Sequence, residues 1–341
     1  MISEKMIQMT KNSSAIRAMF EEGKELAAQF GAKNVYDFSL GNPNVPAPSE
    51  VKTAIEEIIN EEDPLMVHGY MSNSGYEDVR AAIAASLNKR FGTGFSEENI
   101  LMTVGAAGGL NVIFKTLLNP GDEVLTFAPY FGEYRSYVSN YDGILKAVEP
   151  DTATFQPDLE KFAQMITPKT KAVIVNTPNN PTGVVYSEET IVRMVEILCA
   201  KEKEFGISIY LISDEPYREL AYDGVFVPYL TKYYHNTIVG YSFSKSLSLP
   251  GERIGYVLVP DEVDDARTIY AAVCGAGRAL GFVCAPSLIQ HVIAKCAGQV
   301  SDLSVYKKNR DLLYDSLTAY GFTCVHPDGA FYLFMKTPEP D

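Results

Sequence analysis

The 341-residue chain lacks any run of the roughly 18 apolar residues that a membrane-spanning helix needs. Its first residues, MISEKMIQMTKNSSAIRAMFEEG, contain no apolar stretch typical of a secretion signal. No low-complexity segment and no internal repeat occurs. We therefore expect a soluble, cytoplasmic protein with no membrane partner.

Positive charge is also scarce, because 29 lysines and arginines stand against 43 aspartates and glutamates, a formal net charge of −14. An acidic chain repels phosphate at long range, so nucleic acid is not an expected partner, although this balance does not exclude a local basic pocket. Hydrophobic residues make up 46% and charged residues 21%, an ordinary globular composition for one large domain or two smaller ones.

Several familiar motifs are missing. Neither the GxGxxG nor the GxxxxGK[ST] spacing of nucleotide-binding proteins occurs. The five cysteines are widely spaced, form no Cys-x-x-Cys pair and do not cluster with the four histidines. They are Cys199, Cys274, Cys284, Cys296 and Cys324. We therefore expect buried, reduced thiols and no metal site.

Strand-like and helix-like segments alternate through the middle of the chain. Strands are predicted at 99–105, 124–129, 171–178, 207–215, 236–244 and 253–260. Helices are predicted after 105, over 131–141 and over 187–205, the last with Ser187 as its N-cap. This alternation is typical of an α/β fold with a mostly parallel sheet, in which ligands bind beyond the carboxyl ends of the strands.

The two ends of the chain have a different pattern. A helix is predicted over 12–30, and two helices followed by a short GAFYLFMK strand (329–336) are predicted after residue 283. We interpret 45–283 as a large domain, with 1–44 and 284–341 forming a smaller domain.

The segment SFSKSLSLPGERIGY (242–256) places Lys245 between hydroxyl side chains, eight positions before Arg253. A lysine becomes a nucleophile when desolvation or a nearby cation lowers its pKa, and Arg253 is a candidate cation. Together with Ser242 and Ser244, these side chains suit a phosphate-bearing ligand. From this segment alone, a solvated loop lysine is an equally good interpretation.

Three further strand-end segments offer polar groups, two through side chains and one through its backbone. Asp214 ends a buried strand and needs a partner, for which a protonated ring nitrogen, a salt bridge or a helix cap would each serve. Tyr217 could direct its phenol into the same site or simply pack. Asn180, in NTPNNPTG (176–183), could contact a ligand oxygen or belong to an ordinary loop. GAAGGL (105–110) joins a strand to a helix, where free backbone N–H groups can bind an anion.

Taken together, these segments resemble the class I/II aminotransferases, which are fold-type I, pyridoxal-phosphate-dependent enzymes like aspartate aminotransferase. The motifs that carry the resemblance are NNPTG (179–183), DEPY (214–217) and SFSKSLSLPGERIGY (242–256). TVGAAGGL (103–110), NPGDEVLTFAPYF (119–131), YMSNSGYEDVR (70–80) and PDGAFYLF (327–334) support it. The similarity covers nearly the whole chain.

The resemblance implies pyridoxal 5′-phosphate as the cofactor. Lys245 would form the Schiff base and carry the proton between the substrate Cα and the cofactor. Asp214 would keep the pyridine nitrogen protonated, while Asn180 and Tyr217 would contact the ring 3′-oxygen. The phosphate group would be bound by Gly105, Ala106, Ala107, Ser242, Ser244 and Arg253.

The resemblance also predicts contacts around the ring and the substrate. Phe131 would stack on the ring, and Tyr70 would reach the phosphate of a neighbouring subunit, which implies a homodimer. Gly41 and Asn180 are predicted on the substrate side. Arg278 is a further candidate there, with a surface arginine as the alternative.

The expected activity is a ping-pong transfer of an amino group between an L-amino acid and a 2-oxo acid, of the aspartate/glutamate or the aromatic type. In the family, an arginine well after the GAFYLF motif binds the substrate carboxylate, whereas residues 335–341 contain no arginine. We therefore expect a C-terminally incomplete small domain. The alternatives are another fold-type I enzyme (a C–S lyase, an aminocyclopropane-carboxylate synthase or a decarboxylase) or a catalytically impaired cofactor-binding module.

Overall fold

The computed structural model describes residues 2–11 and 15–339, in two compact units, Met1–Pro43 and Asn44–Asp341. The first unit contains α1 (Glu4–Lys11), α2 (Ala15–Phe30) and the short 3₁₀ helix η1 (Ala32–Asn34). The predicted helix over 12–30 is thus present from Ala15, while 12–14 lie outside the described residues. The division of the remainder at residue 283 stays a prediction.

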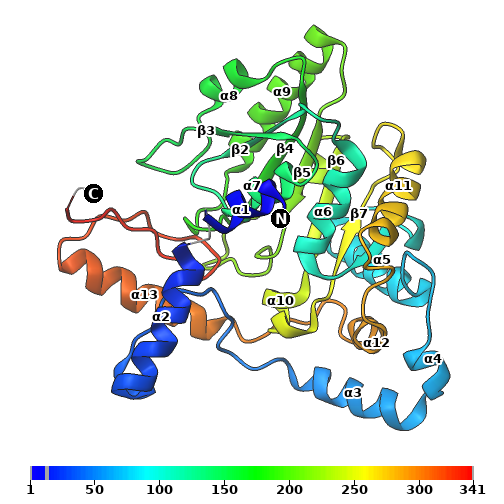
Figure 1. Cartoon of the computed structure of the whole chain (residues 1–341), viewed down its shortest axis with the longest axis horizontal. Helices are drawn as coiled ribbons and strands as arrows, with labels where there is room; N and C mark the ends of the chain where they lie inside the picture. The colour runs from blue at the N-terminus through cyan, green and yellow to red at the C-terminus, as the bar shows by residue number, and fades with distance from the viewer. Residues whose placement is uncertain (1, 12–14, 340–341) are drawn as a thin grey trace. The chain divides into compact units, whose positions relative to one another are not determined.

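The second unit is built around a seven-stranded sheet (Figure 1) with the order β1-β7-β6-β5-β4-β2-β3. Its strands are β1 (Ile100–Thr103), β2 (Glu123–Phe127), β3 (Ile144–Val148), β4 (Thr170–Asn176), β5 (Tyr210–Asp214), β6 (Thr237–Ser242) and β7 (Gly255–Leu258). Only β7 is antiparallel to its neighbours, so β1 to β6 all run in one direction. The predicted mostly parallel sheet is confirmed. The sequence did not predict β3, a half-exposed edge strand.

Helices cover both faces of this sheet. The helices of this unit are α3 (Ser49–Glu61), α4 (Pro64–His68), α5 (Glu77–Phe91), α6 (Gly105–Leu117), α7 (Glu133–Ser139), α8 (Leu159–Met165), α9 (Glu188–Phe205), α10 (Phe243–Ser246), α11 (Ala266–Ala279), α12 (Ser287–Lys295) and α13 (Ser304–Ala319), and only some of them cover the sheet. Three short 3₁₀ helices complete the unit, η2 (Glu97–Asn99), η3 (Leu230–Lys232) and η4 (Pro250–Glu252). One face packs against α6, α7 and α11, and the other against α5 and α12 at the β1 end and against α8 and α9 toward β3. Because both faces are covered, β4 and β5 consist almost entirely of buried residues, as their continuous apolar runs predict.

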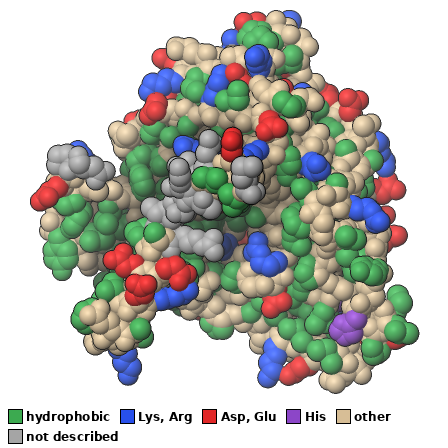
Figure 2. All heavy atoms as spheres, viewed as in Figure 1, with side chains coloured by type: hydrophobic (Ala, Val, Ile, Leu, Met, Phe, Trp, Pro, Cys, Tyr) green, Lys and Arg blue, Asp and Glu red, His purple; other side chains and the backbone are tan. Residues whose placement is uncertain are grey.

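The helix α4 carries two strongly exposed hydrophobic side chains. Leu65 is 81% and Met66 is 64% exposed. In Figure 2, hydrophobic side chains are visible at the lower right of the molecule, where Figure 1 places α4. Such a group of exposed apolar side chains is a candidate contact surface.

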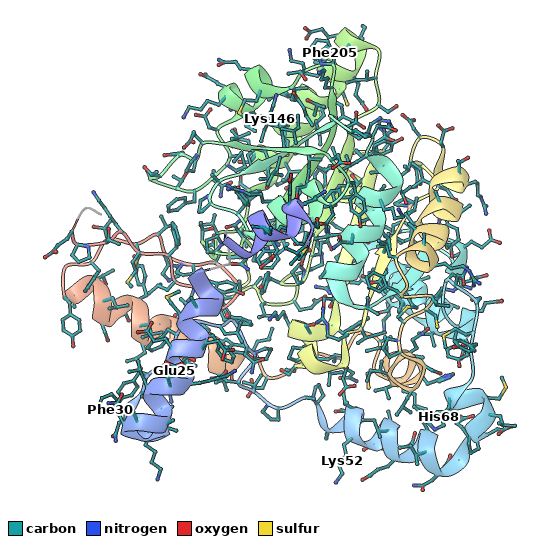
Figure 3. The ribbon with its side chains drawn as sticks, in the orientation of Figure 1. Glu25, Phe30, Lys52, His68, Lys146 and Phe205 are labelled. Carbon is teal, nitrogen blue, oxygen red and sulfur yellow. The ribbon has the colours of Figure 1, made fainter. Side chains whose placement is uncertain are left out.

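The helix α9 begins and ends where its sequence predicts. The side chain of Ser187 accepts a hydrogen bond from the Thr190 N–H, which confirms the N-cap, and Glu188 and Glu189 occupy the first turn. Gly206 follows Phe205 (labelled in Figure 3) in the left-handed conformation, with φ 65°, and ends the helix.

The C-terminal part departs from the prediction at one point. The two predicted helices are present as α12 and α13, but the strand predicted over 329–336 is wrong. Only isolated bridges, Ala221 with Gly329 and Cys324 with Met335, occur there among the described residues. The reason lies in the partners of the backbone. The Gly329 N–H donates to the Gly183 carbonyl and the Ala330 N–H to the Leu220 carbonyl, so the segment bridges two loops instead of extending along one strand.

All five cysteines are free, but only Cys296 is buried, and Cys199 is exposed. The expectation of buried thiols is therefore wrong for the other four, because these side chains lie on helix surfaces and loops. None of the described helices is long and apolar enough to span a membrane. The cytoplasmic location stays a prediction.

Candidate active site

Polar side chains gather where three neighbouring parallel strands end. Asn176 is the last residue of β4, Asp214 of β5 and Ser242 of β6. The Asn176 amide donates to the Asp214 carbonyl over 2.9 Å and accepts from the Asn180 N–H over 2.7 Å. Asn176 therefore fixes the turn that carries Asn180 against the end of β5. The predicted placement of these residues at strand ends is confirmed.

The Asp214 carboxylate is buried and has an incomplete set of hydrogen bonds. Its Oδ2 accepts a 2.5 Å hydrogen bond from the Tyr134 hydroxyl, whereas its Oδ1 is buried without a partner among the described residues. Burial raises the pKa of Asp214 to about 7, the Tyr134 hydrogen bond opposes this rise, and the Glu215 charge adds to it. Asp214 forms no ion pair and caps no helix with the described residues, so the site has room for one more hydrogen-bond donor.

Lys245 lies on α10, the single turn that follows β6 directly. It is largely enclosed, and burial together with the charge of Arg253 lowers the pKa of its ammonium to about 8. Its Nζ is 5.2 Å from the centroid of the Phe331 ring. A lysine with these surroundings is not a solvated loop residue, and near pH 8 a substantial fraction of it is a neutral amine.

Arg253 and the start of α6 approach each other closely. A Cβ on Gly105 would lie 2.8 Å from Nη2 of Arg253, and Gly105 has a φ of 73°. Only glycine fits this approach without strain. Ala106 and Ala107 follow in the first turn of α6, where backbone N–H groups have no partner within the helix. This corner can therefore bind an anion.

The hydroxyls of the Lys245 segment are linked to each other. The Ser242 hydroxyl donates to the Ser244 hydroxyl over 2.8 Å and accepts from the Ser244 N–H over 3.2 Å. Both serines are buried, so these oxygens are held in place beside Lys245.

Tyr217 connects the end of β5 to the C-terminal segment. The Asn180 amide lies 3.4 Å from the Tyr217 hydroxyl, which lies 2.6 Å from the Tyr332 hydroxyl. The Phe331 ring meets the Tyr217 ring edge to face at 5.8 Å. Burial raises the pKa of Tyr217 well above its ordinary value, so its phenol is protonated at neutral pH.

Four further predicted residues are placed less directly in this group. Phe131 packs edge to face on Tyr134, with ring centroids 5.6 Å apart. Tyr70 is 94% exposed, and Arg278 is exposed in the last turn of α11, where its guanidinium forms no hydrogen bond or ion pair with the described residues. Gly41 belongs to the separate unit 1–43. The roles of all four stay predictions.

Sequence reasoning missed Tyr134, Phe331 and Tyr332. Tyr134 follows Phe131 by three positions at the start of α7, a spacing that places both side chains on one face of a helical turn. Tyr332 gives no such local signal, because its contact with Tyr217 joins residues 115 positions apart.

Known proteins are similar to this chain in sequence and in architecture. A family model described as aminotransferase class I and II matches residues 33–340. The aspartate/prephenate aminotransferase of Thermus thermophilus is 31% identical over 336 residues, 97% of this chain and 83% of the relative. The aspartate aminotransferase of Thermotoga maritima is 30% identical over 346 residues, 100% of this chain and 85% of the relative. A solved amino transferase from Eubacterium rectale superposes with a TM-score of 0.97 at 53% identity, covering 100% of this chain and 86% of that chain.

Proposed function

Since the chain belongs to the class I and II aminotransferases, and is thus a transaminase, we propose that it holds pyridoxal 5′-phosphate at Lys245. We further propose that it transfers the amino group of L-aspartate to a 2-oxo acid. The observation that carries this proposal is the pairing of two unusual groups at adjacent strand ends. One is a lysine with its pKa lowered to about 8, and the other is a buried carboxylate with an oxygen that lacks a donor.

The Asp214 site fits the ring of this cofactor. A protonated pyridine nitrogen would supply the donor that Oδ1 lacks, and its charge would favour the ionised carboxylate inside the protein. The hydrogen bond from Tyr134 to Oδ2 would hold the carboxylate in position. A buried carboxylate without such a partner would be destabilising, which is a physical reason for a cationic ligand at this point.

The phosphate group of the cofactor fits the corner formed by Arg253, Gly105 and the first turn of α6. The guanidinium and the helix N-terminus would both attract a dianion. The Ser244 hydroxyl would add a donor, and Ser242, whose own proton goes to the Ser244 oxygen, would orient it. Holding the phosphate here would place the rest of the ligand toward Lys245, whose pKa already reflects the charge of Arg253.

Different residues of the chain would transfer protons and orient the cofactor. When bound, the cofactor supplies an aldehyde that accepts the amino group and a ring that accepts electrons from the substrate Cα. Lys245, with a pKa of about 8, would take a proton from Cα and return one at the cofactor carbon near neutral pH. Asn180 and Tyr217 would hold the ring 3′-oxygen by hydrogen bonds.

The proposed substrate rests on the relatives. Those from Thermus thermophilus and Thermotoga maritima are named aspartate/prephenate and aspartate aminotransferase, at 31% and 30% identity. Arg278, exposed on α11, would reach a dicarboxylate substrate from a second subunit. The donor assignment therefore depends on the proposed homodimer.

The proposed homodimer is supported by the surface next to α4. Tyr70, which is 94% exposed, follows Leu65 and Met66, and a phenol that projects this far is free to reach a neighbouring subunit. His68, labelled in Figure 3, marks the end of α4 between them.

A single-turnover assay tests the proposal. The chain loaded with cofactor is mixed with L-aspartate and no acceptor, and oxaloacetate and ammonia are measured. We expect up to one oxaloacetate per site and no ammonia, because the amino group stays on the cofactor. Lys245→Ala should abolish the reaction, and the exposed Lys203→Ala should leave it intact. Continued turnover with release of ammonia or carbon dioxide would instead indicate a lyase or a decarboxylase.

A further inference from the structure

The hydroxyls of Tyr217 and Tyr332 lie 2.6 Å apart, although their positions in the sequence differ by 115. Tyr217 is only 5% exposed, and its ring also packs edge to face on Tyr332 at 5.5 Å. The two phenols therefore form a short hydrogen bond in a largely dry environment, where such bonds are strong.

Tyr332 is held in place by its own backbone segment. The Asp328 and Gly329 N–H groups both donate to the Gly183 carbonyl over 2.9 Å, and the Ala330 N–H donates to the Leu220 carbonyl over 2.7 Å. The Tyr222 hydroxyl donates to the Ala330 carbonyl. The segment that carries Tyr332 is thus fixed to the turn after β4 and to the chain after β5, the same two segments that carry Asn180 and Tyr217.

The Tyr217 hydroxyl can form only a small number of hydrogen bonds. A phenol oxygen accepts at most two hydrogen bonds and donates one. The Asn180 amide donates to the Tyr217 oxygen, and Tyr217 is the only hydrogen-bond partner of the Tyr332 hydroxyl among the described residues. If Tyr332 donates, both acceptor positions of Tyr217 are filled, and the proton of Tyr217 must point toward a third group.

We propose that Tyr332 is a positioning residue, which donates to Tyr217 and thereby directs the Tyr217 proton toward the 3′-oxygen of the bound cofactor. This inference rests on the proposed function. A hydrogen-bond donor at the 3′-oxygen would stabilise the negative charge on that oxygen. This charge remains when the proton shared by the Lys245 nitrogen and the 3′-oxygen is lost. Loss of Tyr332 should therefore raise the pH at which this proton is lost, while Tyr217 itself stays in contact with the ring.

The test is a titration of the visible absorption of the loaded enzyme against pH. We expect the midpoint to rise by roughly half to one pH unit in Tyr332→Phe, the loss expected for one hydrogen bond. Tyr217→Phe should raise it further. Adding Tyr332→Phe to Tyr217→Phe should change nothing more, because Tyr332 acts through Tyr217.

Tyr306→Phe is the matched control. Tyr306 packs on Phe331 in the same cluster, but its hydroxyl accepts from the Asn44 N–H and does not contact Tyr217. This variant should keep the wild-type midpoint, and thermal unfolding checks that all variants fold. Normal cofactor uptake with an unchanged midpoint in Tyr332→Phe, or an additive effect in the double variant, would overturn this inference alone. A wild-type chain that takes up no cofactor would overturn the proposed function as well.

Discussion

At the scale of single residues, Asp214 combines deep burial with a missing hydrogen bond. Its neighbours supply one donor, the Tyr134 hydroxyl, for two oxygens, and Glu215 adds a like charge. A carboxylate in such surroundings holds its proton to a higher pH than in water. In the proposed function this carboxylate is ionised, so in the chain without cofactor its charge is a source of instability.

This burial predicts a specific pH dependence for the chain without cofactor. The pKa of Asp214 is about 7 in the folded state and 3.8 in the reference state, so between these values the folded chain binds one proton more. The free energy of unfolding should therefore fall as the pH rises from about 4 to about 7, by up to about 1.4 kcal/mol per pH unit from this group. Above pH 7 the contribution stays lost.

Urea unfolding at several pH values checks this prediction. Asp214→Asn lacks the titrating group, so its stability relative to wild type should increase from pH 4 to 7 and then level off. Asp315→Asn, at an exposed position on α13, serves as the control and should run parallel to wild type. If the free energy of unfolding of Asp214→Asn changed with pH in parallel with that of wild type, the assignment to Asp214 would be wrong.

Arg253 should add to the effect of burial on the reactivity of Lys245. Burial and the Arg253 charge lower the pKa of Lys245 to about 8, so its reaction with pyridoxal, which lacks the phosphate, should have a midpoint near that pH. Arg253→Gln removes the repelling charge and should move the midpoint to higher pH. Borohydride trapping followed by mass spectrometry measures the labelled fraction. An unchanged midpoint, equal to that of the control Arg267→Gln on α11, would show that Arg253 does not act on Lys245.

At the scale of elements, the site depends on the joining of separate turns at one edge of the sheet. Gly183 lies at one of these close junctions. With φ 73°, it would place a Cβ 2.6 Å from Cβ of Pro327 and 3.0 Å from the Gly329 carbonyl. The turn after β4 can therefore meet the C-terminal segment only if residue 183 has no side chain.

Gly183→Ala should lower the stability by a few kcal/mol, since it combines backbone strain with a clash. Gly224→Ala is the matched control, because Gly224 has the same φ of 73° and nothing within 4 Å of its missing Cβ. The control should cost about 1 kcal/mol, from the backbone alone. Thermal unfolding of both variants measures the difference in stability. Equal losses of stability would show that the close contact at Gly183 contributes no cost beyond that of the backbone.

The elements that the sequence predicts best are those with the clearest patterns. The continuous apolar runs that became β4 and β5 and the capped helix after Ser187 are correctly predicted. The predicted ends of β4, β5 and β6 also placed Asn180, Asp214 and Lys245 at one edge. The edge strand β3 was not found, because only Val148 of its five residues is buried and the strand includes Lys146, which pairs with Glu123. The 329–336 strand was wrong because its backbone partners belong to loops distant in sequence.

At the scale of the whole molecule, the proposed homodimer would cover the apolar surface next to α4. Leu65→Glu would place a charge in this surface and should convert the dimer to a monomer at micromolar concentration, as sedimentation equilibrium can measure. Tyr320→Glu changes a similarly exposed side chain at the end of α13 and should leave the dimer intact. A wild-type chain that sediments as a monomer, or an Leu65→Glu variant that remains dimeric, would contradict the proposed interface.

The central claim concerns Lys245, and one measurement tests it most directly. The chain is incubated with pyridoxal 5′-phosphate, reduced with borohydride, digested and mapped by mass spectrometry. We predict one reduced cofactor per chain, on the peptide that contains Lys245, and no specific label in Lys245→Ala. Label on another lysine, or a chain that takes up no cofactor, would contradict the account.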